Sequence, residues 1–562
     1  MRNIMGLTKK PAWIFAILIL IVSCAFVIGS FVRYGEHYFN ADISSDLVMA
    51  DFLNEEKTFI SKDFYYSTEI KIANAVNIYQ MMLMIFPDNW HLARLAAIII
   101  NTSIFVMGFM YMSKAVTTEL PVMIVALSAL LLPFSTDYMF LMTFGCCSQI
   151  YAAVTFFDIG ILLRLNKKNR VFRLLVLVLI NTVISCSGLK MVMFSAMPIA
   201  VVSGYFLCSS LTKTHRLSEL TIMPEWPIVL GGLINVLSIG LGFLINKIVI
   251  IPNYHVQEFM DSSLRHFTFA DVLIHLQYLQ DFLGFVGEVP LLSITGVTSF
   301  VTVLLLVFFV FALIILLKKT LRTDFSLTNR NTLYGNAKNS GENEEFGSMG
   351  EGLFPISERV LIIFCISSLF LGILINVSTP KGRSVGSLGV GYYLPGFIML
   401  IVIAFLFITK ISSRQCWVMY LFAFAVYLIF AGKGYTTVRN NMQASDSNYE
   451  QTADWLVENG YTEGFATYWN GNVLTEASNG QIEVWTLWDL KESNIYQWLQ
   501  KVAHSTSYPK GKCFVYATSM QVWNQDVDTR FMESIAESSI VLPNDDRLYL
   551  FESGEDYMRH FR

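Results

Sequence analysis

Two carboxylates near the N-terminus, Asp42 and Asp46, have the type and spacing that acid–base chemistry uses. Residues four apart lie on one face of a helix, so a helical segment here would present both acids together. A third acid, Glu69, follows in the same polar stretch. A partly desolvated carboxylate can take a proton from a hydroxyl nucleophile as that nucleophile attacks an electrophilic carbon. The segment is therefore a candidate catalytic site.

The same residues have a structural interpretation. Asp42 with Ser44 or Ser45 can cap the start of a short helix, and Asp46 can lie on its solvated face. Spacing alone leaves both interpretations open.

The elements that must position these acids are membrane helices. Hydrophobic residues make up 54% of the chain and charged residues only 15%, and the mean hydropathy is +0.52. A bilayer core of about 30 Å needs roughly 20 apolar residues per helix, and we expect about eleven such spans. They are predicted at residues 13–32, 91–112, 119–134, 150–165, 171–186, 194–211, 226–251, 291–317, 359–377, 391–409 and 416–431.

Basic residues predict the orientation, since Lys and Arg accumulate in cytoplasmic loops. With alternating spans, Lys9 and Lys10 and the basic groups at 164–170, 318–322 and 410–414 all fall on one side. The N-terminus is therefore expected in the cytoplasm. Residues 33–90, 252–290, 378–390 and the C-terminal part are expected outside.

Two segments depart from the membrane pattern. Residues 323–352 are rich in Asn, Ser, Gly and Glu, and we expect a disordered cytoplasmic loop there. Residues 432–562 contain short β-branched and aromatic runs between helical patterns at 449–458 and 494–503. The predicted organisation is a membrane region, 1–431, with residues 33–90 as its first external loop, followed by a small extracytoplasmic α/β domain.

Cations that could hold a phosphate are few on the expected outer side. Lys190 follows a span end in Ser187–Lys190, and Lys381 and Arg383 lie in a short loop before Tyr392 and Tyr393. Such residues also snorkel to lipid head groups without any catalytic task. The net charge of −4 argues against nucleic acid as a partner, and the cysteines form no metal-binding or disulfide pattern.

The segments Asp42–Ala50 and Ser61–Ile70, with Gly464–Glu476 and Ser478–Val484 near the C-terminus, carry a family resemblance. They resemble the corresponding segments of an uncharacterised Firmicutes group of the GT-C superfamily, membrane glycosyltransferases that use polyprenyl-phosphate sugars. The fold this implies is a polytopic α-helical membrane protein, GT-C-like, with about eleven transmembrane helices and a small extracytoplasmic domain.

The resemblance also implies an activity. It implies an inverting transfer of a hexosyl or pentosyl group from a polyprenyl-phosphate donor to a cell-wall or surface glycan, at the outer face of a bacterial cytoplasmic membrane. The base maps onto Asp42 first and Asp46 second, and the substrate-binding residues it implies are Glu69, Lys190, Lys381, Arg383, Tyr392 and Tyr393. The resemblance leaves a divalent cation, Mg²⁺ or Mn²⁺, open, although the spacing of Asp42 and Asp46 weakens a shared metal site.

Two other functions stay open at this point. A transporter or flippase of a lipid-linked envelope precursor would need ionisable residues within its spans, and Asp158 is the clearest of the few present. A noncatalytic envelope assembly protein would use the C-terminal domain for binding, and its first-loop acids would be dispensable.

Overall fold

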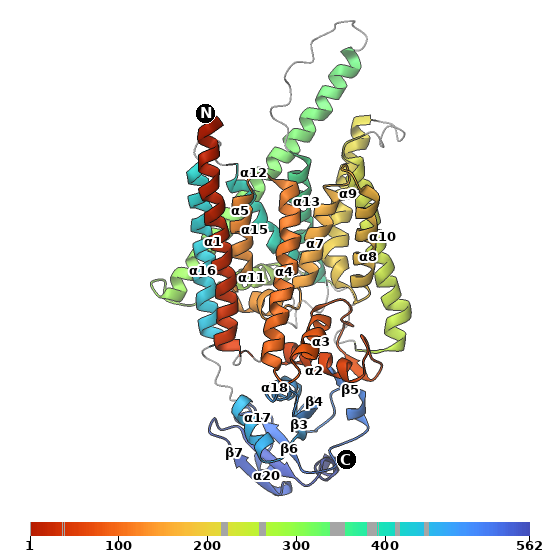
Figure 1. Cartoon of the computed structure of the whole chain (residues 1–562), viewed down its shortest axis with the longest axis vertical. Helices are drawn as coiled ribbons and strands as arrows, with labels where there is room; N and C mark the ends of the chain where they lie inside the picture. The colour runs from red at the N-terminus through yellow and green to blue at the C-terminus, as the bar shows by residue number, and fades with distance from the viewer. Residues whose placement is uncertain are drawn as a thin grey trace.

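The computed structural model describes residues 2–35, 38, 40–214, 223–257, 266–337, 355–378, 391, 393–410, 416–442 and 449–561. A bundle of long helices carries a small mixed domain at one end (Figure 1). The N-terminus of α1 lies at the opposite end of the bundle from this domain.

Each of the eleven predicted spans coincides with a helix. Seven helices are long and apolar enough to cross a membrane, or eight if a bent pair counts as one span. The helices at the predicted spans are α1 (Arg2–Tyr34), α4 (Trp90–Val116), α5 (Leu120–Leu131), α7 (Gln149–Leu162), α8 (Arg170–Ser185), α9 (Met197–Thr214), α10 (Trp226–Ile245), α12 (Ile294–Ala337), α13 (Ile356–Ser378), α15 (Leu394–Ile408) and α16 (Cys416–Met442). Among them, α5, α7, α8 and α15 have only 12, 14, 16 and 15 residues. The chain is a multi-pass membrane protein.

One predicted span is broken. Helix α5 ends at Leu131, Pro133 follows, and the chain turns by 97° into α6 (Thr136–Tyr138) and the π-helical turn η2 (Met139–Thr143). Proline has no N–H for a continuing helix, and the Ser135 side chain accepts a bond from the Tyr138 N–H to start the new one. The straight helix predicted for 119–134 is therefore wrong in its last turn.

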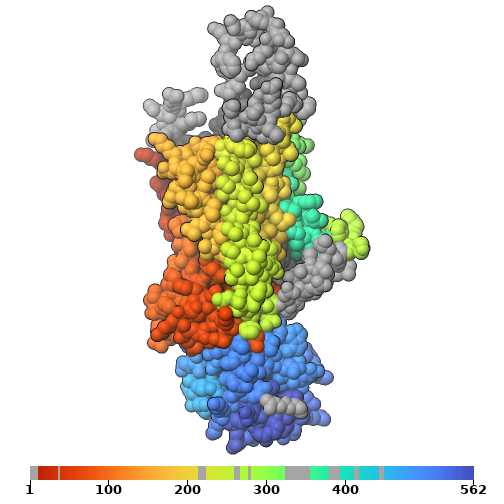
Figure 2. Space-filling view, turned by 90° about the vertical axis from the view of Figure 1, so that its right-hand side faces the viewer, coloured from red at the N-terminus to blue at the C-terminus, as the bar shows by residue number. Residues whose placement is uncertain are grey.

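Two short helices form a layer between the bundle and the C-terminal domain (Figures 1 and 2). They are α2 (Ala41–Glu55), capped by Asn40, and α3 (Ala75–Ile85), capped by Asn74. Both helices lie within residues 33–90, the predicted first external loop.

The C-terminal domain is built on a five-stranded sheet with the order β4-β3-β6-β8-β7. Strands β4, β3 and β6 are parallel, whereas β8 and β7 continue the sheet antiparallel. Its elements are α17 (Tyr449–Glu458), β3 (Glu463–Thr467), α18 (Tyr468–Ala477), β4 (Glu483–Leu487), β5 (Gln500–Lys501), β6 (Cys513–Ala517), α19 (Ser519–Trp523), α20 (Thr529–Ile535), β7 (Ser538–Val541), β8 (Arg547–Phe551) and α21 (Gly554–Met558). The predicted α/β character is confirmed.

The helix predicted at 494–503 is wrong. The Gln500 side chain bonds to both the N–H and the carbonyl of Thr486, which holds this segment extended beside β4. Strand β5 then pairs with β1 (Phe64–Tyr66) of the first loop, and β1 also pairs with β2 (His255–Val256). Three distant parts of the chain therefore share one small sheet.

Some predictions fall on residues that the structure does not describe. The segment 323–352 overlaps the end of α12, which runs to Ala337, and 338–352 lies outside the described residues. The disorder predicted for 323–337 is wrong, because α12 continues through these residues. The disorder of 338–352 and the loop 379–390 stay predictions.

The C-terminal domain docks through α18 onto α2. Arg94, at the start of α4, forms a buried ion pair with Glu476 of α18, with N–O distances of 2.8 and 2.5 Å. The Ser44 hydroxyl of α2 donates to the same carboxylate (2.5 Å), and Asn472 donates to Ser45 (2.7 Å). One polar cluster thus joins the bundle, α2 and the C-terminal domain.

We predict that Glu476→Gln destabilises the protein by about 3 kcal/mol, because it leaves the buried Arg94 charge without a counter-ion. The measurement is the midpoint of thermal unfolding of the purified full-length protein, with limited proteolysis between α16 and α17. Glu533→Gln is the control, since its pair with Arg547 is far more exposed and should cost less than about 1 kcal/mol. Equal losses in the two variants would contradict the role given to the buried pair.

Candidate functional site

Asp42 lies in the first turn of α2, facing the C-terminal domain. Its own N–H is capped by the Asn40 side chain (3.0 Å), so Asn40 and not Asp42 caps the helix. The Tyr468 hydroxyl, from the start of α18, donates to Oδ1 of Asp42 (2.5 Å). Burial, reinforced by the Asp42 charge, raises the pKa of Tyr468 well above its usual range. The phenol therefore remains a hydrogen-bond donor that orients the carboxylate and leaves Oδ2 available.

Asp46 lies one helical turn further and is almost fully buried, with 1% of its side chain exposed. Lys71, from the segment after β1, forms an ion pair with it. The Asp46 carboxylate raises the pKa of Lys71, so this ammonium stays charged. Asp46 is thus engaged in holding a cation, whereas Asp42 is the half-buried acid of the two.

Glu69 and Lys190, both predicted as substrate-binding residues, come together in the structure. The Lys190 ammonium lies 3.2 Å from Glu69 and 5.4 Å from the centre of the Tyr151 ring. The Ser187 hydroxyl accepts from the Ile72 N–H (3.1 Å) and donates to the Ile72 carbonyl (2.8 Å). These bonds tie the first loop to the turn that carries Lys190.

The result is a cluster of alternating charges that we name the acid–lysine cluster: Asp42, Asp46, Lys71, Glu69 and Lys190. The charge of Asp42 acts on Asp46, and the charge of Glu69 acts on Lys71, so these groups are close enough to interact electrostatically. In such a cluster a half-buried carboxylate can accept a proton, and ammonium groups can stabilise a phosphate that departs nearby.

A divalent cation does not fit the described part of this cluster. Within the residues that the structure describes, no three His, Cys, Asp or Glu side chains form a group that could hold a metal ion. Asp46, one of the two expected ligands, contacts an ammonium instead. We therefore derive no step through a metal.

The remaining predicted residues are only partly placed. Lys381, Arg383 and Tyr392 lie outside the described residues. Tyr393 is fully buried at the start of α15 and packs against His275, with ring centres 6.2 Å apart.

The sequence interpretation missed three residues of this region: Lys71, Tyr468 and Arg94. Lys71 is two residues from Glu69 and could have been found by its place in the same loop. Arg94 is a charge near the start of an otherwise apolar span, which is a recognisable signal. Tyr468 carries no such signal, because its partner is 426 residues away.

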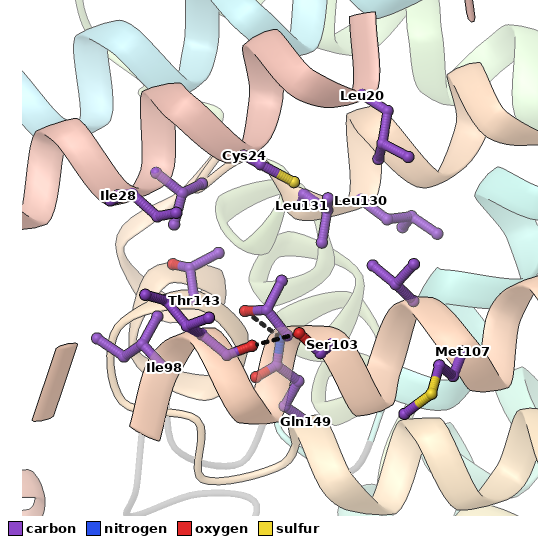
Figure 3. A pocket seen from close by; sticks show the side chains of 14 residues that line it. Leu20, Cys24, Ile28, Ile98, Ser103, Met107, Leu130, Leu131, Thr143 and Gln149 are labelled. Carbon is purple, nitrogen blue, oxygen red and sulfur yellow. Dashed lines mark hydrogen bonds between the residues drawn. The ribbon is translucent and has the colours of Figure 1, made fainter. Parts of the chain in front are cut away.

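An apolar groove of about 430 Å³ lies between α1, α4 and the end of α5 (Figure 3). Leucine, isoleucine and methionine side chains line most of it, and Thr143, Ser103 and Gln149 supply polar atoms. The turn that contains Thr143 leads to Gly145, which packs against Ile43 of α2. The η2 turn at one wall of the groove is thus close in sequence to a residue that contacts α2.

Comparisons with known proteins show the fold. No protein-family model matches the chain. No curated protein matches it either. The chain is similar to the crystal structure of ArnT from Cupriavidus metallidurans bound to undecaprenyl phosphate, with a TM-score of 0.54 and 10% identity over 95% of this chain and 98% of that one. The chain thus has a GT-C-like fold along nearly its whole length.

A second, smaller cavity of about 100 Å³ lies where α2 meets the C-terminal domain. Asp51 and Glu55 of α2 face Lys501, Glu483 and His504 across it. Burial, reinforced by Glu55, raises the pKa of Asp51 to about 6. Folding therefore favours the protonated form of Asp51, and the stability this gives is complete below pH 4 and lost as the pH rises through 6.

We predict that Asp51→Asn stabilises the protein by about 1 kcal/mol at pH 8 and hardly at all at pH 4, because the amide cannot ionise. The expected gain is small, since Asp51 keeps partial contact with water, which screens its charge. Thermal unfolding at the two pH values is the measurement, with the exposed Asp526→Asn as control. A gain that is equal at both pH values would show that the charge of Asp51 is not the cause.

Proposed function

We propose that the protein is an integral-membrane glycosyltransferase that moves a sugar from a polyprenyl-phosphate donor to a cell-wall or surface glycan. The observation that carries this proposal is the acid–lysine cluster, which lies where α2 meets a GT-C-like bundle. The similar ArnT structure holds undecaprenyl phosphate, which supports a polyprenyl phosphate as the leaving group here.

Asp42 is the base in this proposal. Its Oδ2 accepts the proton of an acceptor hydroxyl, whose oxygen forms a bond to the anomeric carbon of the donor. The bond from that carbon to the phosphate oxygen breaks, and polyprenyl phosphate departs with the electron pair. A single displacement of this kind inverts the anomeric centre.

The cations stabilise the departing phosphate. Lys190 keeps a quarter of its side chain exposed, which suits it for a phosphate oxygen better than the nearly covered Lys71. Glu69 holds Lys190 in place, and Asp46 does the same for Lys71. Lys381, Arg383, Tyr392 and Tyr393 remain proposed substrate-binding residues.

The membrane placement follows the distribution of basic residues. We propose that the N-terminus lies in the cytoplasm of a bacterium and that the acid–lysine cluster and the C-terminal domain lie outside. The polyprenyl chain of the donor then occupies the apolar groove, which is lined by residues of the membrane helices α1, α4 and α5.

The transporter alternative has less support. Asp158 accepts hydrogen bonds from Asn181 (2.8 Å) and Ser195 (2.5 Å) and is 1% exposed, so it joins helices and lines none of the cavities described above. A noncatalytic assembly protein would need no oriented carboxylate beside a pair of ammonium groups.

We predict that Asp42→Asn lowers the rate of sugar transfer at least about 100-fold, because an amide cannot accept the proton. The assay supplies the purified protein with polyprenyl-phosphate sugars and envelope fractions and measures the labelled glycan. Asp63→Asn, an exposed acid of the same loop, is the control and should keep full activity. Transfer at the wild-type rate by Asp42→Asn would reject Asp42 as the base.

We further predict that Ser103→Phe, which fills the apolar groove, lowers kcat/KM for long-chain donors about tenfold and leaves a short-chain donor nearly unaffected. The physical reason is lost contact between the polyprenyl chain and the groove. Leu237→Phe on the exposed face of α10 controls for a bulky residue elsewhere. If both donors lose activity equally, the chain does not use this groove.

A further inference from the structure

A polar cavity of about 470 Å³ lies beside the break in the fifth span, separate from the apolar groove. Its walls are the break itself, the loop after α11 (Phe269–Phe282), the first turns of α12 and the last turns of α16. The apolar groove uses Leu130 and Leu131, whereas this cavity uses the residues just beyond the proline. Residues just before the break thus line the apolar groove, and residues just after it line the polar cavity.

Lys433 of α16 is the buried cation of this cavity. It is 4% exposed, although it lies within a membrane-spanning helix. Its ammonium donates to the Thr302 hydroxyl of α12 and to the Gly284 carbonyl (3.4 Å). Among the described residues, no carboxylate lies within ion-pair distance of it. A buried ammonium whose partners are neutral is costly unless an anion joins it.

The surroundings of Lys433 are built for a polar occupant. Thr436, Thr437, Asn440 and Asn441 follow it at helical spacing, so the last two turns of α16 present one polar face to the cavity. Thr295, Thr298 and Thr302 form the facing stripe on α12. Polar faces within membrane-spanning helices line cavities or binding sites.

Gly284 forms a close wall of the cavity. It has a φ of +74°, and a Cβ there would lie 2.9 Å from the Phe134 carbonyl and 3.3 Å from the Lys433 ammonium. Only glycine lets the loop pass this near to both the broken span and the lysine.

We propose that this cavity is a binding site for a phosphate-class oxyanion, held by Lys433 and by the hydroxyl and amide donors around it. Arg439 adds a second positive charge at the wall, and Asp137 is the acid that also lines it, so the lining residues keep a net positive charge. An ammonium with several hydroxyl donors matches the oxygens of a phosphate. The anion belongs either to a lipid head group or to a free phosphate.

The site is independent of the proposed transfer reaction, because it rests on Lys433 and not on the acid–lysine cluster. The cavity and the apolar groove also share no lining residue among those that the structure describes. A test by binding alone therefore separates its failure from a failure of the proposed function.

The experiment titrates the purified full-length protein with inorganic phosphate at constant ionic strength, and compares thermal unfolding in phosphatidylglycerol and phosphatidylcholine nanodiscs. Lys433→Met removes the charge, Lys433→Arg keeps it, and Thr298→Val removes one hydroxyl. Thr320→Val is the matched control, because the hydroxyl of this buried threonine of α12 donates to the Leu316 carbonyl of its own helix (3.1 Å). Lys190→Gln identifies any phosphate bound at the acid–lysine cluster.

We expect Lys433→Met to weaken binding of the anion at the Lys433 cavity at least about tenfold, whether the probe is inorganic phosphate or phosphatidylglycerol. Lys433→Arg, Thr320→Val and Lys190→Gln should retain this binding. Loss of phosphate binding identifies a free anion, and loss of the phosphatidylglycerol stabilisation identifies a lipid head group. If Lys433→Met does not fold, a weaker binding by Thr298→Val carries the same conclusion. The proposal is overturned if the wild type responds to neither probe, or if neither Lys433→Met nor Thr298→Val weakens the response.

Discussion

A guanidinium and a carboxylate buried between the bundle and the C-terminal domain hold the rest of the site in place. Arg94 contacts Glu476 of α18 and lies 3.5 Å from the Ile43 carbonyl of α2, so one side chain joins three elements. Because α18 is fixed there, Tyr468 at its first turn reaches Asp42. Removing either partner of a buried ion pair leaves an uncompensated charge away from water, so the alignment of the two parts of the molecule depends on both Arg94 and Glu476.

The C-terminal domain is therefore a structural part of the candidate site. It supplies the donor that orients Asp42, and β5 extends a small sheet whose other strands come from two separate loops. The division between Asp42 and Asp46 has the same origin. Both acids share a face of α2, yet Lys71 covers one of them and Tyr468 orients the other. The two aspartates therefore have different roles because their side chains contact different residues.

The sequence predicted the local features well, because they depend on neighbouring residues. The spans follow from hydrophobic length, and the strands β3, β4, β6 and β8 follow from β-branched and aromatic runs. Glu69 and Lys190 were each predicted as substrate-binding residues from the resemblance, but the ion pair between them was not predicted. Asp42 as the base remains a proposal.

What could not be predicted depends on distant contacts. The ion pair of Arg94 with Glu476 joins residues 382 positions apart, so no local sequence pattern predicts it. Lys433 was placed outside the last span because the apolar run ends at Ala431, whereas α16 continues to Met442.

The central claim is that α2, oriented by the C-terminal domain, presents Asp42 to a polyprenyl-phosphate sugar. The direct test is a cryo-electron microscopy structure of the protein in nanodiscs with polyprenyl phosphate. The account predicts the phosphate within hydrogen-bond distance of Lys190 and the chain in the groove beside Ser103. A phosphate bound at the other end of the bundle, far from Asp42, would contradict it.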